Sequence, residues 1–191
     1  MQRMVKKQLI AWVGSLVIEE NKNYYNRLLF VHSCVKTECY DKKHAFTLAG
    51  EEKVYTPGSE KLIVTFKGWK ICPLICYDLR FPVWSRNVEN YDVLIYVANW
   101  PVTRIQAWKA LLKARAIENM SFTIGVNRIG IDANKYEYSG DSSILNYMGE
   151  ELSTLKKNEN GIIEATLVKT EQDSIRERLG FLNDQEAFKI L

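Results

Sequence analysis

The chain has 191 residues, 47% hydrophobic and 26% charged, which is typical of one globular domain and excludes a disordered or fibrous protein. A formal net charge of +3, spread along the chain, does not indicate a nucleic-acid partner. No apolar run is long enough to cross a bilayer, and two histidines without a CxxC pair argue against a zinc site. We therefore expect a cytoplasmic protein with neither a membrane nor a nucleic-acid partner.

Runs rich in Val, Ile, Leu and aromatic residues predict strands. In chain order these are Leu9–Ile18, Arg27–His32, Leu62–Phe66, Trp69–Cys76, Asp92–Ala98, Phe122–Asn127, Ser142–Asn146 and Ile162–Val168. Helical spacing of apolar residues predicts helices at Val102–Met120, Phe81–Val88 and Glu171–Leu179. Because helices interleave with strands while tight turns indicate hairpins, we expect a layered α/β fold with mixed or antiparallel sheets.

The beginning of the chain has unusual features. Basic residues at Met1–Lys7 precede an apolar stretch, as in a secretory signal, but charged Glu19 and Glu20 follow without a small-residue cleavage site. We interpret the stretch as a strand. The residues before this strand resemble the middle of a helix and have no N-terminal cap, so we expect the chain to be the C-terminal part of a longer protein.

The segment Pro73–Pro82 carries the sharpest chemical signal. An apolar strand ends at Cys76, and a polar turn then leads into a helix, which is typical of a nucleophile elbow. Backbone N–H groups beyond the cysteine could face a developing oxyanion, and Arg80 or a nearby lysine would favour the reactive thiolate. The alternative is that Cys76 is one of the buried cysteines common in protein cores.

A second polar cluster, Tyr40–His44, contains two adjacent lysines. A lysine held near a thiol can lower its pKa and stabilise a tetrahedral oxyanion, although adjacent lysines also occur on solvated faces. The pair Glu51-Glu52, ahead of the Pro57-Gly58 turn, is by itself consistent with a charged turn.

Taken in order, these motifs resemble those of the nitrilase superfamily of carbon–nitrogen hydrolases. The run Ile71–Asn87 is especially similar to the omega-amidase branch, also described as 2-oxoglutaramate amidases. The resemblance covers essentially the whole chain and implies a four-layer α-β-β-α sandwich. It rests on Tyr-x-Lys-x-His, a glutamate ahead of a Pro-Gly turn, Cys-Tyr-Asp-Leu-Arg-Phe-Pro, Ala98–Trp100 and Arg115–Asn119.

The resemblance also implies the site. Cys76 matches the nucleophile, Lys42 the triad lysine, and Glu51, rather than Glu52, the second glutamate that orders the site. In the implied mechanism a triad glutamate takes the thiol proton and the thiolate attacks an amide carbonyl. Lys42 and the N–H of Tyr77 stabilise the oxyanion, ammonia leaves, and water hydrolyses the thioester without any cofactor.

The remaining candidates have two interpretations each. Asn99 and Trp100 end a strand at the edge expected for Cys76, where they either line the substrate pocket or cap and pack the strand. Arg80 either binds a substrate carboxylate or forms a salt bridge, and Tyr77 completes the candidate substrate-binding set. Three further residues are expected to be structural: Arg115 and Glu118 as an ion pair, and His44 as a hydrogen-bonding residue.

One part of the family pattern is missing. The triad glutamate should lie well before the Tyr-x-Lys-x-His motif, but none of the acids there stands in the expected setting; they are Glu19, Glu20, Glu38 and Asp41. We therefore expect residues 1–191 to form one carbon–nitrogen hydrolase domain that lacks its N-terminal strands and helix.

The resemblance implies a homodimer that hydrolyses a small linear amide, such as the omega-amide of a dicarboxylate (2-oxoglutaramate), to a carboxylate and ammonia. Two alternatives remain. One is another nitrilase-type reaction such as N-carbamoyl hydrolysis. The other, favoured by the missing glutamate, is a catalytically inactive fragment or a non-enzymatic oligomer partner.

Overall fold

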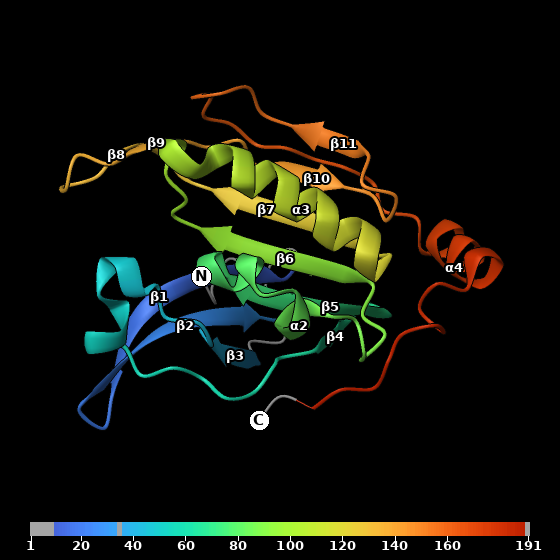
Figure 1. Cartoon of the computed structure of the whole chain (residues 1–191), viewed down its shortest axis with the longest axis horizontal. Helices are drawn as coiled ribbons and strands as arrows, with labels where there is room; N and C mark the ends of the chain where they lie inside the picture. The colour runs from blue at the N-terminus through green and yellow to red at the C-terminus, as the bar shows by residue number, and fades with distance from the viewer. Residues whose placement is uncertain (1–9, 34–35, 190–191) are drawn as a thin grey trace.

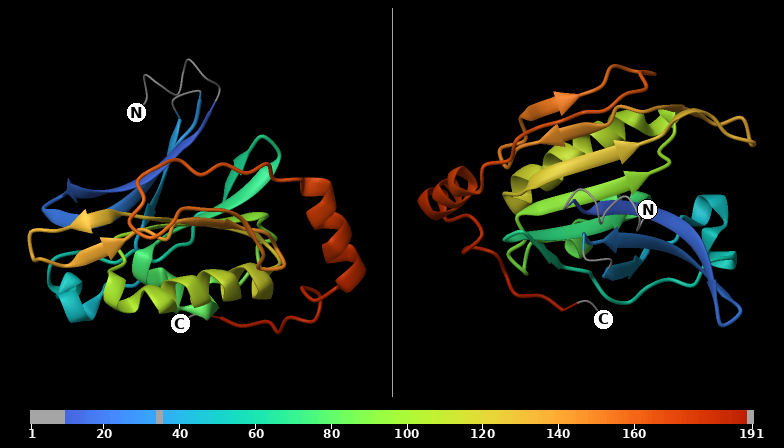
Figure 2. Two further views of the ribbon diagram at one scale, coloured as in Figure 1. Left: turned by 90° about the horizontal axis from the view of Figure 1, so that it is seen from above. Right: turned by 180° about the vertical axis from the view of Figure 1, so that it is seen from behind.

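The computed structural model describes residues 10–33 and 36–189, so Met1–Lys7 and the first residue of the expected strand Leu9–Ile18 lie outside it. Two sheets stack against each other (Figures 1 and 2). The smaller sheet is antiparallel, with the order β1-β2-β3, and contains β1 (Trp12–Glu20), β2 (Asn23–Val31) and β3 (Thr37–Asp41). The turn at Asn21 and Lys22, both with positive φ, joins β1 to β2.

The larger sheet has six strands in the order β11-β10-β7-β6-β5-β4. Its centre is parallel, β5 with β6 and β6 with β7, and its edges are antiparallel, as the sequence predicted for a mixed sheet. A separate hairpin, β8 with β9, extends from the end of β7 (Figure 1). The strands are β4 (Val64–Phe66), β5 (Trp69–Ile75), β6 (Val93–Ala98), β7 (Phe122–Asn127), β8 (Ile129–Ile131), β9 (Glu137–Ser139), β10 (Ser143–Leu145) and β11 (Glu151–Thr154).

Helix α3 (Ile105–Asn119) covers the face of the larger sheet that points away from the smaller one (Figure 2). Its buried Trp108 and Leu112 pack on β7 at Gly125, where a Cβ would lie 2.4 Å from a Leu112 methyl. Glycine is therefore required at this point of close approach. Among the described residues the layers are α3, the larger sheet and the smaller sheet, with no helix on the outer face of the smaller sheet.

The shorter helices are α2 (Pro82–Ser85), directly after the cysteine turn, and α4 (Lys169–Leu179), at one end of the larger sheet (Figure 1). Gln172 of α4 is fully buried and donates to the carbonyl of Asp92, which fixes this helix to the start of β6. None of the helices in the described part of the chain is long and apolar enough to cross a membrane.

Three sequence predictions need correction. The helix predicted at Phe81–Val88 is limited to α2, because the backbone of Arg86 is already extended. The predicted strand Ile162–Val168 is wrong: its alternating side chains are half-buried and exposed, but its backbone joins no strand ladder. The predicted helix Val102–Met120 begins instead with a separate 3₁₀ turn, η4 (Val102–Arg104), before α3. The predicted strand Phe122–Asn127 has the bounds of β7.

Candidate active site

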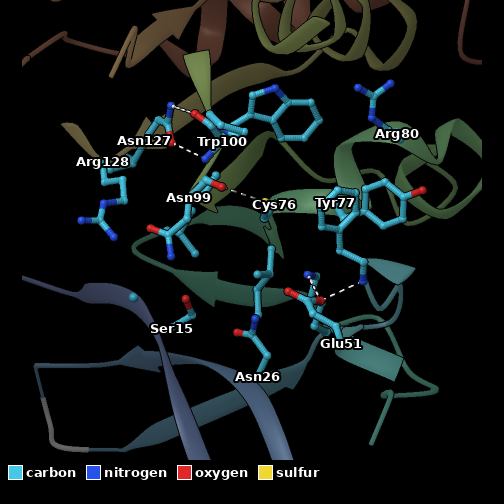
Figure 3. Close-up of a pocket in the computed structure, with 18 of the residues that line it drawn as sticks. Ser15, Asn26, Glu51, Cys76, Tyr77, Arg80, Asn99, Trp100, Asn127 and Arg128 are labelled. Atoms are coloured by element: carbon cyan, nitrogen blue, oxygen red, sulfur yellow. Dashed lines mark hydrogen bonds and ion pairs between the residues drawn. The ribbon is translucent and has the colours of Figure 1, made fainter. Parts of the chain in front are cut away.

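A pocket of about 460 Å³ opens where β5, β6 and β7 end, between the larger sheet and strands β1 and β2 (Figure 3). Carboxyl ends of parallel strands meet at one edge of a sheet, so residues far apart in sequence converge there. Those that carry polar or charged side chains are Ser15, Asn26, Lys42, Glu51, Cys76, Tyr77, Arg80, Asn99, Arg104, Asn127 and Arg128.

Cys76 stands at the point where β5 ends and the 3₁₀ turn η3 (Cys76–Arg80) begins. Its φ of 44° is left-handed, a conformation that costs energy for any residue with a side chain and is typical of functional turns. The turn leaves the thiol partly exposed in the pocket, with Sγ 4.0 Å from the carbonyl oxygen of Asn99. The elbow predicted from the sequence is therefore present in the structure.

Lys42 and Glu51 form an ion pair in the same pocket. The lysine follows β3, and the glutamate begins the 3₁₀ turn η2 (Glu51–Lys53), which comes after η1 (Thr47–Ala49). Lys42 Nζ lies 2.5 Å from Glu51 Oε2, and the same oxygen accepts the Phe46 N–H at 2.8 Å. Glu52 is exposed and lies outside the pocket lining, so Glu51 is the member of the pair that meets the lysine.

The electrostatics at Cys76 differ from the sequence-based expectation. Burial raises the pKa of the Cys76 thiol above its usual value of 9.0, the nearby Lys42 charge lowers it, and Glu51 raises it. The net direction is upward, because removing the thiol from water outweighs the attraction of the lysine. Arg80 is not among the groups that shift this pKa, so its expected role in favouring the thiolate is not supported.

Asp78, which the sequence analysis did not select, holds the cysteine turn and the lysine loop together. Its fully buried carboxylate accepts the Ile75 N–H and the Tyr40 hydroxyl on Oδ2. Oδ1 accepts the N–H of His44 and lies 2.8 Å from His44 Nδ1. These four groups belong to β3, to β5 and to the loop after Lys42, so one carboxylate links the cysteine turn to the lysine loop. His44 has the structural role expected of it.

The aromatic candidates form the wall beside the cysteine. The Tyr77 ring lies between the rings of Phe46 and Phe81, at centroid distances of 4.9 and 5.2 Å. Trp100 is buried yet lines the pocket, and its indole N–H donates to the carbonyl of Arg104 at 2.8 Å. The Arg80 guanidinium lies 5.1 Å from the Trp100 ring centroid.

Several polar positions have clear structural partners. Arg115 pairs with Glu118 at 2.8 Å and donates to the carbonyl of Leu79, as expected for an ion pair on α3. Asn127, which ends β7, accepts the Trp100 N–H and donates to the Trp100 carbonyl. The sequence signal that could have identified Asn127 is its position at the end of a predicted strand on the same sheet edge.

The acids that precede the Tyr-x-Lys-x-His motif do not reach the pocket. Glu20 and Asp41 both bind Arg27, and Glu38 binds His32. Glu19 is exposed and, like the other three, absent from the pocket lining. Among the described residues, Glu51 is thus the only acid that lines the pocket. The same residues contain no group of three or more His, Cys, Asp or Glu that could hold a metal ion.

The α/β fold places an elbow cysteine beside a lysine–glutamate pair, an arrangement that is chemically suited to nucleophilic attack by a thiol. The sequence profile described as Carbon-nitrogen hydrolase matches residues 1–176, and the chain belongs to this family.

Named relatives agree with this assignment. The chain is 42% identical over 177 residues to "Omega-amidase YafV" of Escherichia coli, covering 93% of this chain and 69% of that protein. It is 34% identical to the "2-oxoglutaramate amidase" of Bacillus subtilis, and the match covers 90% of this chain and 66% of that protein.

A solved structure shows the same fold. XC1258 from Xanthomonas campestris, described as a CN-hydrolase superfamily protein with an arsenic adduct in the active site, aligns with a TM-score of 0.95 and 36% identity. The alignment covers 99% of this chain and 74% of that one. The predictions of a nitrilase-superfamily fold and of an amidase-class enzyme are confirmed.

Proposed function

We propose that this protein hydrolyses the omega-amide of a small dicarboxylate, such as 2-oxoglutaramate, to the dicarboxylate and ammonia through a thioester on Cys76. The observation that carries the proposal is the convergence of Cys76, Lys42 and Glu51 in one pocket, with the cysteine on a left-handed elbow. The substrate class is supported by relatives named omega-amidase and 2-oxoglutaramate amidase.

The first step is attack of the Cys76 thiolate on the amide carbonyl carbon. The carbonyl oxygen becomes an oxyanion, which accepts hydrogen bonds from Lys42 Nζ and from the backbone N–H of Tyr77. Collapse of this intermediate breaks the carbon–nitrogen bond. The thiol proton leaves with the amide nitrogen as ammonia, and water then cleaves the thioester to the carboxylate and regenerates the thiol.

Glu51 orders the lysine loop in this proposal. Through Oε2 it holds Lys42 and the Phe46 N–H, which fixes the loop that carries the lysine.

Arg80 binds the carboxylate at the far end of the substrate. Its guanidinium forms no salt bridge with any acid in the described residues and rests beside the Trp100 ring. An arginine held by an aromatic face retains its fork of N–H donors, which matches the two oxygens of a carboxylate. Asn99 and Trp100 line the adjoining wall.

The direct test is ammonia release from omega-amides by purified protein and its cysteine variants. Cys76→Ala should abolish release, whereas Cys39→Ala, which removes an exposed free cysteine outside the pocket, should leave it unchanged. Undiminished release from Cys76→Ala would overturn the proposal. The substrate panel should include N-carbamoyl compounds, and a preference for those would replace the omega-amide assignment.

We also propose a homodimer formed through the α2 and α3 face, which lies on one side of the molecule together with the C-terminal segment (Figures 1 and 2). Val83, Ile117 and Phe188 expose 53%, 48% and 44% of their surface there, and Val83 and Phe188 line one shallow cavity. Light scattering should give twice the monomer mass, and Ile117→Glu should shift it toward the monomer. A wild-type monomer at micromolar concentration would contradict the dimer.

A further inference from the structure

Three arginines line the pocket, and none of their side chains is paired with an acid in the described residues; they are Arg80, Arg104 and Arg128. The single described acid of the lining, Glu51, is already matched by Lys42. The pocket therefore carries an excess of positive charge. Guanidinium groups without an acid partner favour an anionic ligand that supplies paired acceptors.

Trp100 contacts two of these arginines through different groups. The exposed Arg80 guanidinium lies over the Trp100 ring, and the Trp100 indole N–H donates to the Arg104 backbone carbonyl at 2.8 Å. The half-buried Arg104 guanidinium lies 5.0 Å from the Phe46 ring centroid, and that ring contacts Tyr77, the residue after the cysteine. Each guanidinium rests on an aromatic ring through its flat face, which leaves its N–H edge available to a ligand.

Arg128 belongs to a different part of the pocket. It follows β7, its guanidinium lies 4.7 Å from the Tyr138 ring centroid of the β8–β9 hairpin, and Figure 3 shows it on the opposite side of Cys76 from Arg80. Arg80 and Arg104 are thus the two arginines associated with the Trp100 and Phe46 wall.

We propose that Arg80 and Arg104 together bind a 2-oxo acid head group, and that Arg104 determines the preference for 2-oxo amides over simple dicarboxylate amides. This inference rests on the proposed function and extends it to a specificity-determining residue. Arg80 takes the carboxylate, and Arg104 takes the 2-oxo oxygen.

The chemistry of the head group calls for a further donor beside the one guanidinium fork, and Arg104 is the half-buried arginine that can supply it. A simple carboxylate presents two oxygens, which one guanidinium fork satisfies. A 2-oxo acid presents three acceptor oxygens in or near one plane, so its third oxygen needs another donor. A site that supplies that donor also rejects ligands that lack the oxygen, because the donor is then left unpaired.

The test measures binding to the full chain with Cys76→Ala, so that no turnover is needed. Calorimetric titrations use three ligands of equal chain length: 2-oxoglutaramate, glutaramate, which lacks the oxo group, and pentanamide, which also lacks the carboxylate. Adding Arg104→Gln should weaken the binding of 2-oxoglutaramate by about ten- to hundredfold, which is the effect of one charge-assisted hydrogen bond. The binding of glutaramate should weaken by less than about threefold. Adding Arg80→Gln should weaken the binding of both acids.

Two more variants separate the causes. Arg104→Lys keeps the charge but not the fork, and it should also lose the preference for 2-oxoglutaramate. Arg178→Gln, on the exposed surface of α4, should change no affinity. The inference would be overturned if Arg104→Gln lost affinity equally for 2-oxoglutaramate and glutaramate, or lost none. It would also be overturned if the Cys76→Ala protein did not bind 2-oxoglutaramate. Absence of ammonia release from wild-type protein would instead overturn the proposed function while leaving these affinities to decide the role of Arg104.

Discussion

Replacing Asp78 with asparagine should destabilise the protein strongly, because this carboxylate accepts four hydrogen bonds in a fully buried position. An asparagine side chain offers one oxygen and one N–H₂ group. Turned one way, the amide N–H₂ faces the Tyr40 hydroxyl and the Ile75 N–H, so two donors lose their acceptor. Turned the other way, it leaves the His44 N–H without an acceptor, while His44 Nδ1 can accept from it after a change of tautomer.

The magnitude follows from one or two lost bonds. A hydrogen bond to a charged group contributes about 1.5–3 kcal/mol, so the variant should lose about 1.5–6 kcal/mol of a total that is about 5–15 kcal/mol for a domain. The assay is urea unfolding followed by tryptophan fluorescence, which the five tryptophans of the chain make sensitive. The matched control is Asp173→Asn on the exposed side of α4, which should change the unfolding free energy by less than about 0.5 kcal/mol. A loss below about 1 kcal/mol in Asp78→Asn would refute the claim that this residue joins the two loops.

Three further predictions concern pH and packing. Alkylation of Cys76 by iodoacetamide should rise with pH and reach half its maximum above pH 9.0, because burial raises the pKa of the thiol and only the thiolate reacts. Lys42→Met removes the charge that lowers the pKa of Cys76, so the midpoint of alkylation should move to higher pH. Glu51→Gln removes a charge that raises this pKa, so the midpoint should move to lower pH. Shifts of the two variants in the same direction would show that charge is not the cause. Gly125→Ala should cost about 1–3 kcal/mol in urea unfolding, since its Cβ would overlap Leu112 and Trp108, and an unchanged midpoint would mean that α3 can move aside.

The position of Cys76 on an elbow could be predicted from the sequence because it depends on local patterns. A buried strand, a polar turn and a following proline placed Cys76 on an elbow, and the bounds of β7 follow from a compact apolar run. The pairing of Lys42 with Glu51 came from the order of family motifs. Spacing alone would not have given it, because two 3₁₀ turns bring these residues together.

Other features depend on tertiary context that no local pattern contains. Ile162–Val168 alternates like a strand, but a strand also needs a partner edge, and none pairs with it. Arg104 was absorbed into a predicted helix, and only the separate turn η4 and its contact with Trp100 place it in the pocket. Asp78 could not be distinguished from an ordinary turn residue until its four donors were seen together.

Trapping of the covalent intermediate tests the account most directly. Protein mixed with 2-oxoglutaramate, quenched in acid within the first turnovers and digested, should yield the Cys76 peptide heavier by the mass of the substrate less ammonia. The adduct should be absent from the Cys39 peptide and from the Cys76→Ala protein. Continued ammonia release while the Cys76 peptide stays unmodified, or while Cys76 is blocked by prior carboxymethylation, would contradict the assignment of this residue as the nucleophile.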